Sequence, residues 1–174
     1  MLRKSLWIPV LGLLLIPAAS AHAQKYLDKG TWELTLSGSG ASNRDVNSGN
    51  FGANIGIGYF VLDGLEITGR QQISYSDPDV GPTDWAFSTA VAVDYHFDLD
   101  RWQPFIGAAI GYNYGSGTTD TGIFGPEGGV KYFVKDDTFL YALVQYQFFF
   151  HNGSDLDNFS DGSFLYAIGI GFTW

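Results

Sequence analysis

Large apolar residues alternate with small or polar residues along most of the chain, and turn-forming residues interrupt this alternation at regular intervals. A period of two is typical of a β-strand with two unlike faces, and no segment favours the 3.6-residue period of an amphipathic helix. The interruptions leave segments of about ten residues, the length that a tilted strand needs to cross a bilayer. The eight predicted strands are Thr31–Gly40, Phe51–Phe60, Leu65–Ser76, Trp85–Phe97, Trp102–Tyr114, Ile123–Phe133, Thr138–Phe150 and Ser163–Trp174.

Every charged residue well inside a predicted strand falls on the face opposite the large apolar row. In the third strand, for example, Glu66 and Arg70 share the face opposite Ile67. Random placement would divide the charges between both faces, so their separation indicates two different environments. The polar face carries Glu33, Glu66, Arg70, Asp94, Glu127 and Lys131, and His96 falls on it beside Asp94.

Two kinds of barrel would orient these faces in opposite directions. The apolar row fills the core of a soluble barrel such as a lipocalin, but it meets lipid in an outer-membrane barrel, whose polar row fills the lumen. Here the polar face has little lysine and much Gly, Ala and Ser, which suits a narrow interior. The apolar rows end in aromatic residues, which favour a membrane interface. These residues include Trp32, Tyr59, Tyr75, Trp85, Phe97, Trp102, Tyr114, Tyr132, Phe150 and Trp174.

The connections between the predicted strands alternate in length. Short turns occupy Leu62–Gly64, Asp98–Arg101 and Val134–Asp137, whereas longer polar loops occupy Ala41–Asn50, Asp77–Asp84, Gly115–Gly122 and His151–Gly162. Outer-membrane barrels have short periplasmic turns and longer outer loops, and they close because unpaired backbone groups are costly in lipid. We therefore predict an all-β fold, an eight-stranded antiparallel transmembrane up-and-down β-barrel with both termini periplasmic.

The last predicted strand resembles the assembly signal of small eight-stranded outer-membrane β-barrel proteins of the OmpA/OmpX-like family. The matching positions are Tyr166, Ile168, Ile170, Phe172 and Trp174. WQPFIGAAIGYNYG resembles the fifth strand of that family, and FGPEGGVKYFVKDDTFLYALVQYQ its sixth and seventh. The resemblance spans Thr31 to Trp174 and implies insertion by the barrel-assembly machinery. It says little about molecular activity, because one fold serves many functions.

The beginning of the chain predicts export. Arg3 and Lys4 precede the apolar run LWIPVLGLLLIP, and small residues follow, so residues 1–23 read as a signal peptide and 24–174 as the barrel domain. Without Arg3 and Lys4, seven basic residues face eighteen acidic ones, which argues against a nucleic-acid partner. Cysteine is absent, so no disulfide framework is possible. We expect a location in the outer membrane of a Gram-negative bacterial cell.

The inward charges form the first candidate site. An eight-stranded barrel has an interior just wide enough for side chains to fill, so a structural salt-bridge network is the preferred interpretation. The alternative is a gated path for ions or protons through that network.

Two further candidates lie in the loops. The acidic stretches Ser76–Asp84 and Asn152–Gly162 suggest solvated turns that bind divalent ions loosely, because neither contains a twelve-residue calcium loop with its closing Glu. His151 and Ser154 suggest a lipid-modifying hydrolase like the outer-membrane deacylase, but their spacing of three fails to put them on one strand face.

The function that these patterns favour is a non-enzymatic structural or surface-interaction role in the cell envelope. The alternatives are a narrow, porin-like pore for ions or small solutes and, less favoured, the hydrolase. We expect no catalytic residue, no cofactor and no metal site. The expected partners are outer-membrane lipid, lipopolysaccharide and the barrel-assembly machinery, with the protein itself a monomer.

Overall fold

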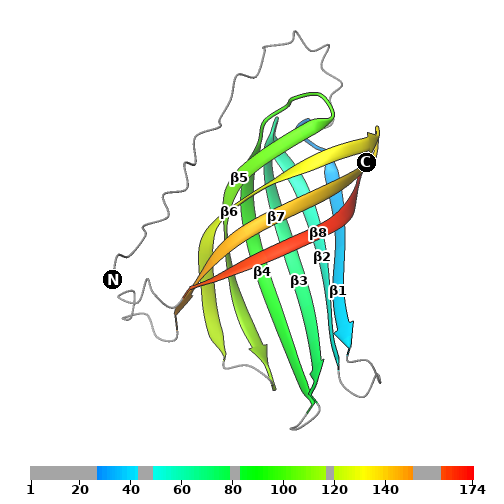
Figure 1. The fold of residues 1–174 in the computed structure, drawn as a ribbon. Coiled ribbons are helices and arrows are strands. Elements are labelled where there is room, and N and C mark those ends of the chain that lie inside the picture. Colours follow the sequence, from blue (N-terminus) through cyan, green and yellow to red (C-terminus); the bar gives the residue numbers. More distant parts are fainter. Residues whose placement is uncertain (1–26, 43–48, 79–82, 117–119, 151–161) are drawn as a thin grey trace, which may run out of the picture.

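Eight antiparallel strands form a closed barrel in which each strand pairs with its neighbour in the sequence (Figure 1). The computed structural model describes residues 27–42, 49–78, 83–116, 120–150 and 162–174. The strands are β1 (Trp32–Ser42), β2 (Gly49–Leu62), β3 (Leu65–Asp77), β4 (Asp84–His96), β5 (Trp102–Gly115), β6 (Thr121–Lys135), β7 (Thr138–Phe150) and β8 (Ser163–Thr173). The predicted fold class is confirmed, and every predicted strand boundary lies within two residues of the observed one. The described residues contain no helix long and apolar enough to cross a membrane.

The barrel closes where the first strand meets the last. β1 and β8 pair from Glu33 with Thr173 to Ser37 with Gly169. Beyond the ladder, Trp32 and Trp174 exchange two backbone hydrogen bonds of 3.0 and 3.1 Å. The final tryptophan therefore completes the wall at the end of the barrel that carries the short turns.

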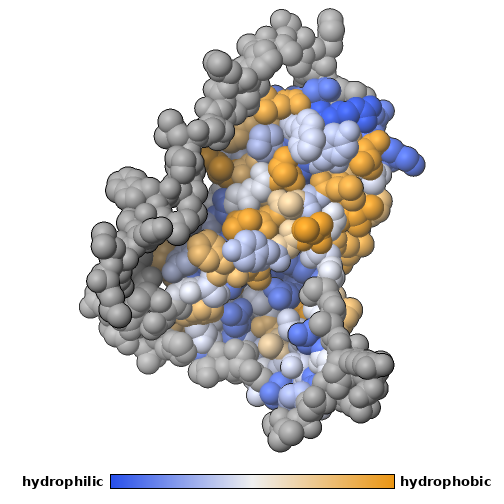
Figure 2. Space-filling view, viewed as in Figure 1, coloured by the Kyte–Doolittle hydropathy of each residue, from blue (hydrophilic) through white to orange (hydrophobic). Residues whose placement is uncertain are grey.

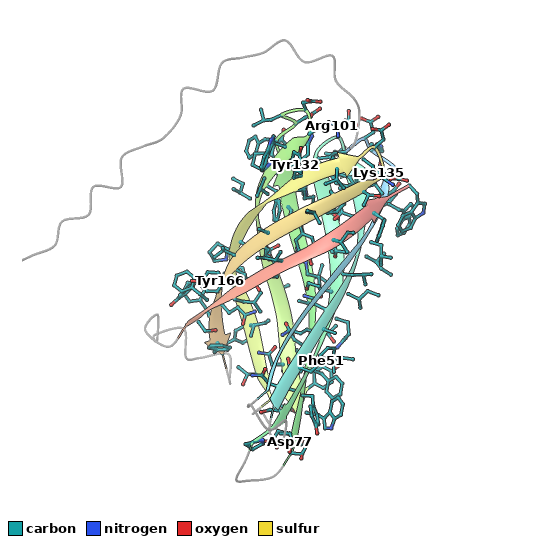
Figure 3. All side chains as sticks on the ribbon, turned by 45° about the vertical axis from the view of Figure 1, so that its right-hand side comes forward. Phe51, Asp77, Arg101, Tyr132, Lys135 and Tyr166 are labelled. Carbon is teal, nitrogen blue, oxygen red and sulfur yellow. The ribbon has the colours of Figure 1, made fainter. Side chains whose placement is uncertain are left out.

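The short turns have sequences that suit their geometry. Between β2 and β3, Asp63 and Gly64 form the connection, and Gly64 has a φ of 76°, a conformation that glycine adopts without strain. Between β4 and β5, Asp100 has a φ of 61°, and its N–H donates to the Asp98 carboxylate over 3.2 Å. Figure 3 places Arg101 and Lys135 at this end of the barrel and Asp77 at the opposite end.

The large apolar rows face outward along the wall. Figure 2 shows apolar residues over much of the visible barrel surface. Aromatic pairs gather near the two ends of the strands. Trp32–Tyr59 and Trp102–Tyr132 lie at the short-turn end, with ring centroids 4.9 and 4.7 Å apart, and Tyr75–Trp85 lies at the loop end, with centroids 4.8 Å apart. Two aromatic belts around an apolar band are the pattern of transmembrane barrels.

A small aromatic core fills the short-turn end of the interior. Phe60, Phe133 and Phe139 are fully buried and pack with Leu27, which precedes β1. Leu27 is held there because its carbonyl accepts a hydrogen bond of 2.9 Å from the Gly64 N–H. The strand pattern did not single out these rings, although their positions place them on the same face as the inward charges.

The strand ends that flank the four long connections lie at the end of the barrel opposite the short turns (Figure 1). The predicted loops Ala41–Asn50, Asp77–Asp84, Gly115–Gly122 and His151–Gly162 each fall partly outside the described residues. The predicted signal peptide, residues 1–23, lies wholly outside them, so that division of the chain stays a prediction.

Candidate functional site in the barrel interior

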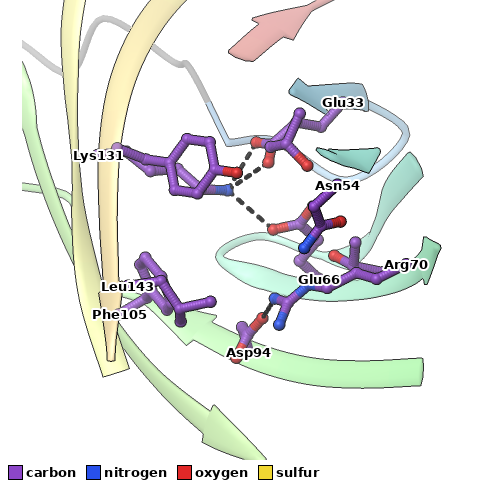
Figure 4. A pocket seen from close by; sticks show the side chains of 11 residues that line it. Glu33, Asn54, Glu66, Arg70, Asp94, Phe105, Lys131 and Leu143 are labelled. Atoms are coloured by element: carbon purple, nitrogen blue, oxygen red, sulfur yellow. Dashed lines mark hydrogen bonds and ion pairs between the residues drawn. The ribbon is translucent and has the colours of Figure 1, made fainter. Parts of the chain in front are cut away.

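A layer of charged side chains crosses the lumen, and Lys131 lies at the centre of one half of it. We call this set, Glu33, Glu66, Arg70, Asp94, His96, Glu127 and Lys131, the charged layer. The Lys131 ammonium on β6 lies 2.6 and 2.7 Å from the two carboxylate oxygens of Glu33 on β1, and 2.9 Å from Glu66 on β3 (Figure 4). Both carboxylates and the lysine are buried, so solvent screens these contacts little. The pairs join strands on different sides of the barrel.

Arg70 organises the other half of the layer. Its guanidinium reaches from β3 to Glu127 on β6, with N–O separations of 2.7 and 2.8 Å, and to Asp94 on the neighbouring β4 at 3.1 Å. A guanidinium presents several donors in one plane, which allows it to serve two carboxylates at once. Arg70 therefore ties β3, β4 and β6 together near mid-barrel.

His96 connects the charged layer to the aromatic core. Its Nε2 lies 2.9 Å from a Glu66 oxygen, so its partner is Glu66 on β3 rather than Asp94 on its own strand. Glu66 faces Asp94 in the β3–β4 register, which makes it a diagonal cross-strand neighbour of His96 at a separation that long side chains can bridge. The imidazole also packs against Phe60 and Phe105, with ring centroids 5.4 and 5.0 Å away.

Aromatic rings surround the Lys131 ammonium from the short-turn side. The nitrogen lies 5.1 Å from the Phe139 ring centre and 5.7 Å from those of Phe60 and Phe105. These distances are in the range of cation–π attraction. The ammonium thus has carboxylates on one side and ring faces on the other, which accounts for a lysine that is only 3% exposed.

Little free space remains in the charged layer. The cavity lined by Glu33, Asn54, Glu66, Arg70, Asp94 and Lys131 measures about 20 Å³ of space for the centres of water-sized spheres. That volume holds one or two water molecules at most. The charged layer is therefore filled, and an ion path through it would need the salt bridges to separate.

All seven predicted lumen residues lie inside the barrel, six of them buried and Arg70 with its side chain 17% exposed. The sequence analysis did not single out three buried glutamines on the same inner face. Gln103 is fully buried and donates to the Asp98 carboxylate at 2.8 Å, and Gln147 donates to Gln145 at 2.9 Å. Their inward position in the alternating pattern is the signal that would have identified them.

The predicted assembly residues form the outward row of β8. Tyr166, Ile168, Ile170, Phe172 and Trp174 are all exposed, and Figure 3 shows Tyr166 on the outer side of the wall. Exposure of this row makes it available to lipid, but its role in assembly stays a prediction. The hydrolase candidates His151 and Ser154, and the acidic stretch Asn152–Asp161, lie outside the described residues.

Solved structures with the same architecture are small outer-membrane barrels. The chain is similar to Neisserial surface protein A, with a TM-score of 0.54 and 16% identity over 82% of this chain and 94% of the other. It is similar to the N-terminal β-barrel domain of Pseudomonas aeruginosa OprF, with a TM-score of 0.55 and 16% identity over 84% and 98% of the two chains. It is also similar to the Yersinia pestis outer membrane protein Ail, with a TM-score of 0.54 and 10% identity over 84% and 100%.

No protein-family model and no curated protein matches the sequence. At these identities the structural likeness establishes the fold alone. The chain has the fold of small eight-stranded outer-membrane β-barrels, which confirms the resemblance first indicated by its strand pattern.

Proposed function

We propose that this protein is an integral outer-membrane barrel with a structural or surface-interaction role in the bacterial envelope and no enzymatic activity. The observation that supports this proposal is the orientation of the side chains in the barrel wall. Apolar side chains such as Ile106 and Ile110 are 60% and 57% exposed, while the ionic side chains in the middle of the strands lie in the lumen. This arrangement would be unstable in water but suits hydrocarbon. Two of the similar structures are of a surface protein and an outer membrane protein, which supports the same location.

The absence of native cysteine allows a clean test of location and orientation. Ser116, exposed beside a long loop, and Asp136, exposed in a short turn, give two single-cysteine variants, Ser116→Cys and Asp136→Cys. In intact cells a membrane-impermeant maleimide is expected to label the first and to label the second only after the outer membrane is permeabilised. Ile106→Cys, in the lipid-facing row, is the control and should resist the aqueous reagent in both cases. Equal labelling of Ser116→Cys and Asp136→Cys in intact cells would refute the proposed orientation.

The structural role and the surface-interaction role predict different outcomes for a loop deletion. Replacing residues 151–162 with a two-residue turn would remove surface contacts while keeping the barrel wall. If the role is surface interaction, this variant should behave like a gene deletion in binding to partner cells or molecules. If the role is structural, the same variant, expressed in the gene-deletion strain, should restore the resistance of the envelope to detergent as well as the parent protein does.

The two alternatives have their own assays. The filled charged layer gives no support to a pore. In planar-bilayer recordings we expect no stepwise conductance from the parent protein that changes in Arg70→Ala or Lys131→Ala. For the hydrolase, acyl-ester cleavage that is lost in His151→Ala would overturn the non-enzymatic proposal.

A further inference from the structure

The wall of the barrel is incomplete between β1 and β8 in its loop-side half. Within the described parts of these strands, pairing stops at Ser37 and Gly169, although β1 continues to Ser42 and β8 begins at Ser163. Both strands stay fully paired with their other neighbours, β2 and β7. Figure 1 shows β8 diverging from β1 toward the loop end. One backbone edge of each strand is therefore open along the unpaired stretch.

Gly169 marks the last position at which the seam is closed. A methyl group added at Gly169 would meet the Leu36 carbonyl and the Ser37 side chain of β1. Ile168 and Tyr166 on β8 are correspondingly the most exposed large apolar residues of the described chain, at 78% and 71%.

The outward row of β1 changes in character at the point where the seam stops. If the register continued, Gly38 would face Ile168 and Gly40 would face Tyr166, following the observed pairing of Ser37 with Gly169. Cross-strand side-chain contacts stabilise a sheet, and glycine offers none. The outward row of β1 changes from Trp32, Leu34 and Leu36 to glycine where the strands separate.

We call this opening the β1–β8 slot. Its membrane side and its lumen side have different linings. Two adjoining hollows of about 320 and 610 Å³ occupy it, a size in the range of about 300–1,000 Å³ for small-molecule sites. On the membrane side it is lined by Leu36, Ile55, Leu140, Ile168 and Ile170, and toward the lumen by Ser37, Asn54 and Gln72. Figure 2 shows polar residues within the wall, framed by apolar surface. No charged side chain is among the residues that line the two hollows.

We propose that the β1–β8 slot binds a single-chain lipid with an uncharged, hydrogen-bonding head group. The chain would lie against Ile55 and Ile168, and the head would reach Ser37, Asn54 and Gln72 together with the open backbone edges. Backbone polar groups facing hydrocarbon need partners, and such a head group supplies both donors and acceptors. Asn54 also lines the small cavity beside Arg70, so the slot and the charged layer adjoin at this residue. This inference rests on the proposed bilayer location.

A photo-crosslinking experiment tests the proposal on the full mature chain in phosphatidylcholine vesicles. The probe is a monoacylglycerol with a diazirine in its chain, and adducts are mapped by mass spectrometry. We expect adducts on Ala53, Ile55 and Ile168 about tenfold above those on Val91 and Ile106, which face outward on β4 and β5 and are at least as exposed as Ile55. Excess unlabelled monoacylglycerol should remove the slot adducts and leave the background. Asn54→Leu should lower slot labelling severalfold, whereas Asn113→Leu, an inner-face amide on β5 away from the slot, should not.

Three outcomes would overturn the proposal. The first is uniform labelling around the wall. The second is ready oxidation of the pair Gly38→Cys/Ile168→Cys to an internal disulfide in vesicles, because the seam would then be closed; Ser37→Cys/Gly169→Cys, within the paired part, is the positive control. The third is a disulfide-linked dimer of Ile168→Cys, which would show that a second copy covers the edge. Failure of the bilayer location is distinguishable, because the chain would then not float with vesicles and Val91 and Ile106 would also stay unlabelled.

Discussion

Replacing Lys131 tests whether the charged layer holds the barrel together. Lys131→Met keeps an unbranched side chain of similar length but removes the ammonium that contacts Glu33 and Glu66 at 2.6–2.9 Å. The two carboxylates would stay buried without their shared cation, and His96 would be the one described partner left to Glu66. Removing one member of a buried ion pair costs about 3–5 kcal/mol, because the remaining charge is left uncompensated. We expect the free energy of unfolding to fall by that amount.

The assay is urea unfolding of the barrel in phospholipid vesicles, followed by tryptophan fluorescence and by heat-modifiable migration on gels. Lys135→Met is the matched control, since it changes the same residue type on the same strand at an exposed position and should cost less than about 0.5 kcal/mol. The triple variant Glu33→Gln/Glu66→Gln/Lys131→Met removes the charges together and should recover at least half of the lost stability. If Lys131→Met unfolds at the same urea concentration as the parent, the interior pairs do not contribute as argued.

Three further outcomes are expected. Arg70→Met should lower the unfolding free energy by about 2–5 kcal/mol in the same urea assay, because Glu127 and Asp94 lose their cation. Gly125→Val should reduce the yield of folded, heat-modifiable barrel, since its side chain would collide with the Tyr146 carbonyl, whereas Gly69→Val, with open space around it, should fold normally. Trp174→Ala should slow insertion into vesicles measured by the gel shift, and an unchanged rate would argue against its part in the assembly signal.

The fold was predictable because each strand repeats the same local rule. A period of two assigns every residue to one of two faces. The small residues of the polar face, the aromatic ends of the apolar rows and the alternating connection lengths then indicate that the polar face is inside. The β6 and β7 boundaries, such as the start of β7 at Thr138, follow from turn residues alone. The same rule could have identified the buried rings of Phe133 and Phe139, since they share a face with Lys131 and Leu143.

The partners inside the barrel were not predictable from the same rule. Alternation gives the face of a residue but not its height along the axis or the strand it points toward. Lys131 and Glu33 are 98 positions apart, and Arg70 and Glu127 are 57 apart, so their contacts depend on the register of every intervening strand. The contact of His96 with Glu66 rather than with Asp94 likewise depends on the register of neighbouring strands.

The interactions that hold the barrel closed are concentrated toward the short-turn end. The aromatic core around Phe60, the Lys131 half of the charged layer and all of the β1–β8 ladder lie there. Toward the loop end the described inner face carries amides such as Gln72 and Gln147, and the seam is open. Under the proposed bilayer location, this division keeps the ion pairs behind a closed wall and leaves backbone and amide side chains at the open end. An opening at the opposite end would expose the ion pairs to hydrocarbon, where unpaired charge is far more costly than the amides of Asn54 and Gln72.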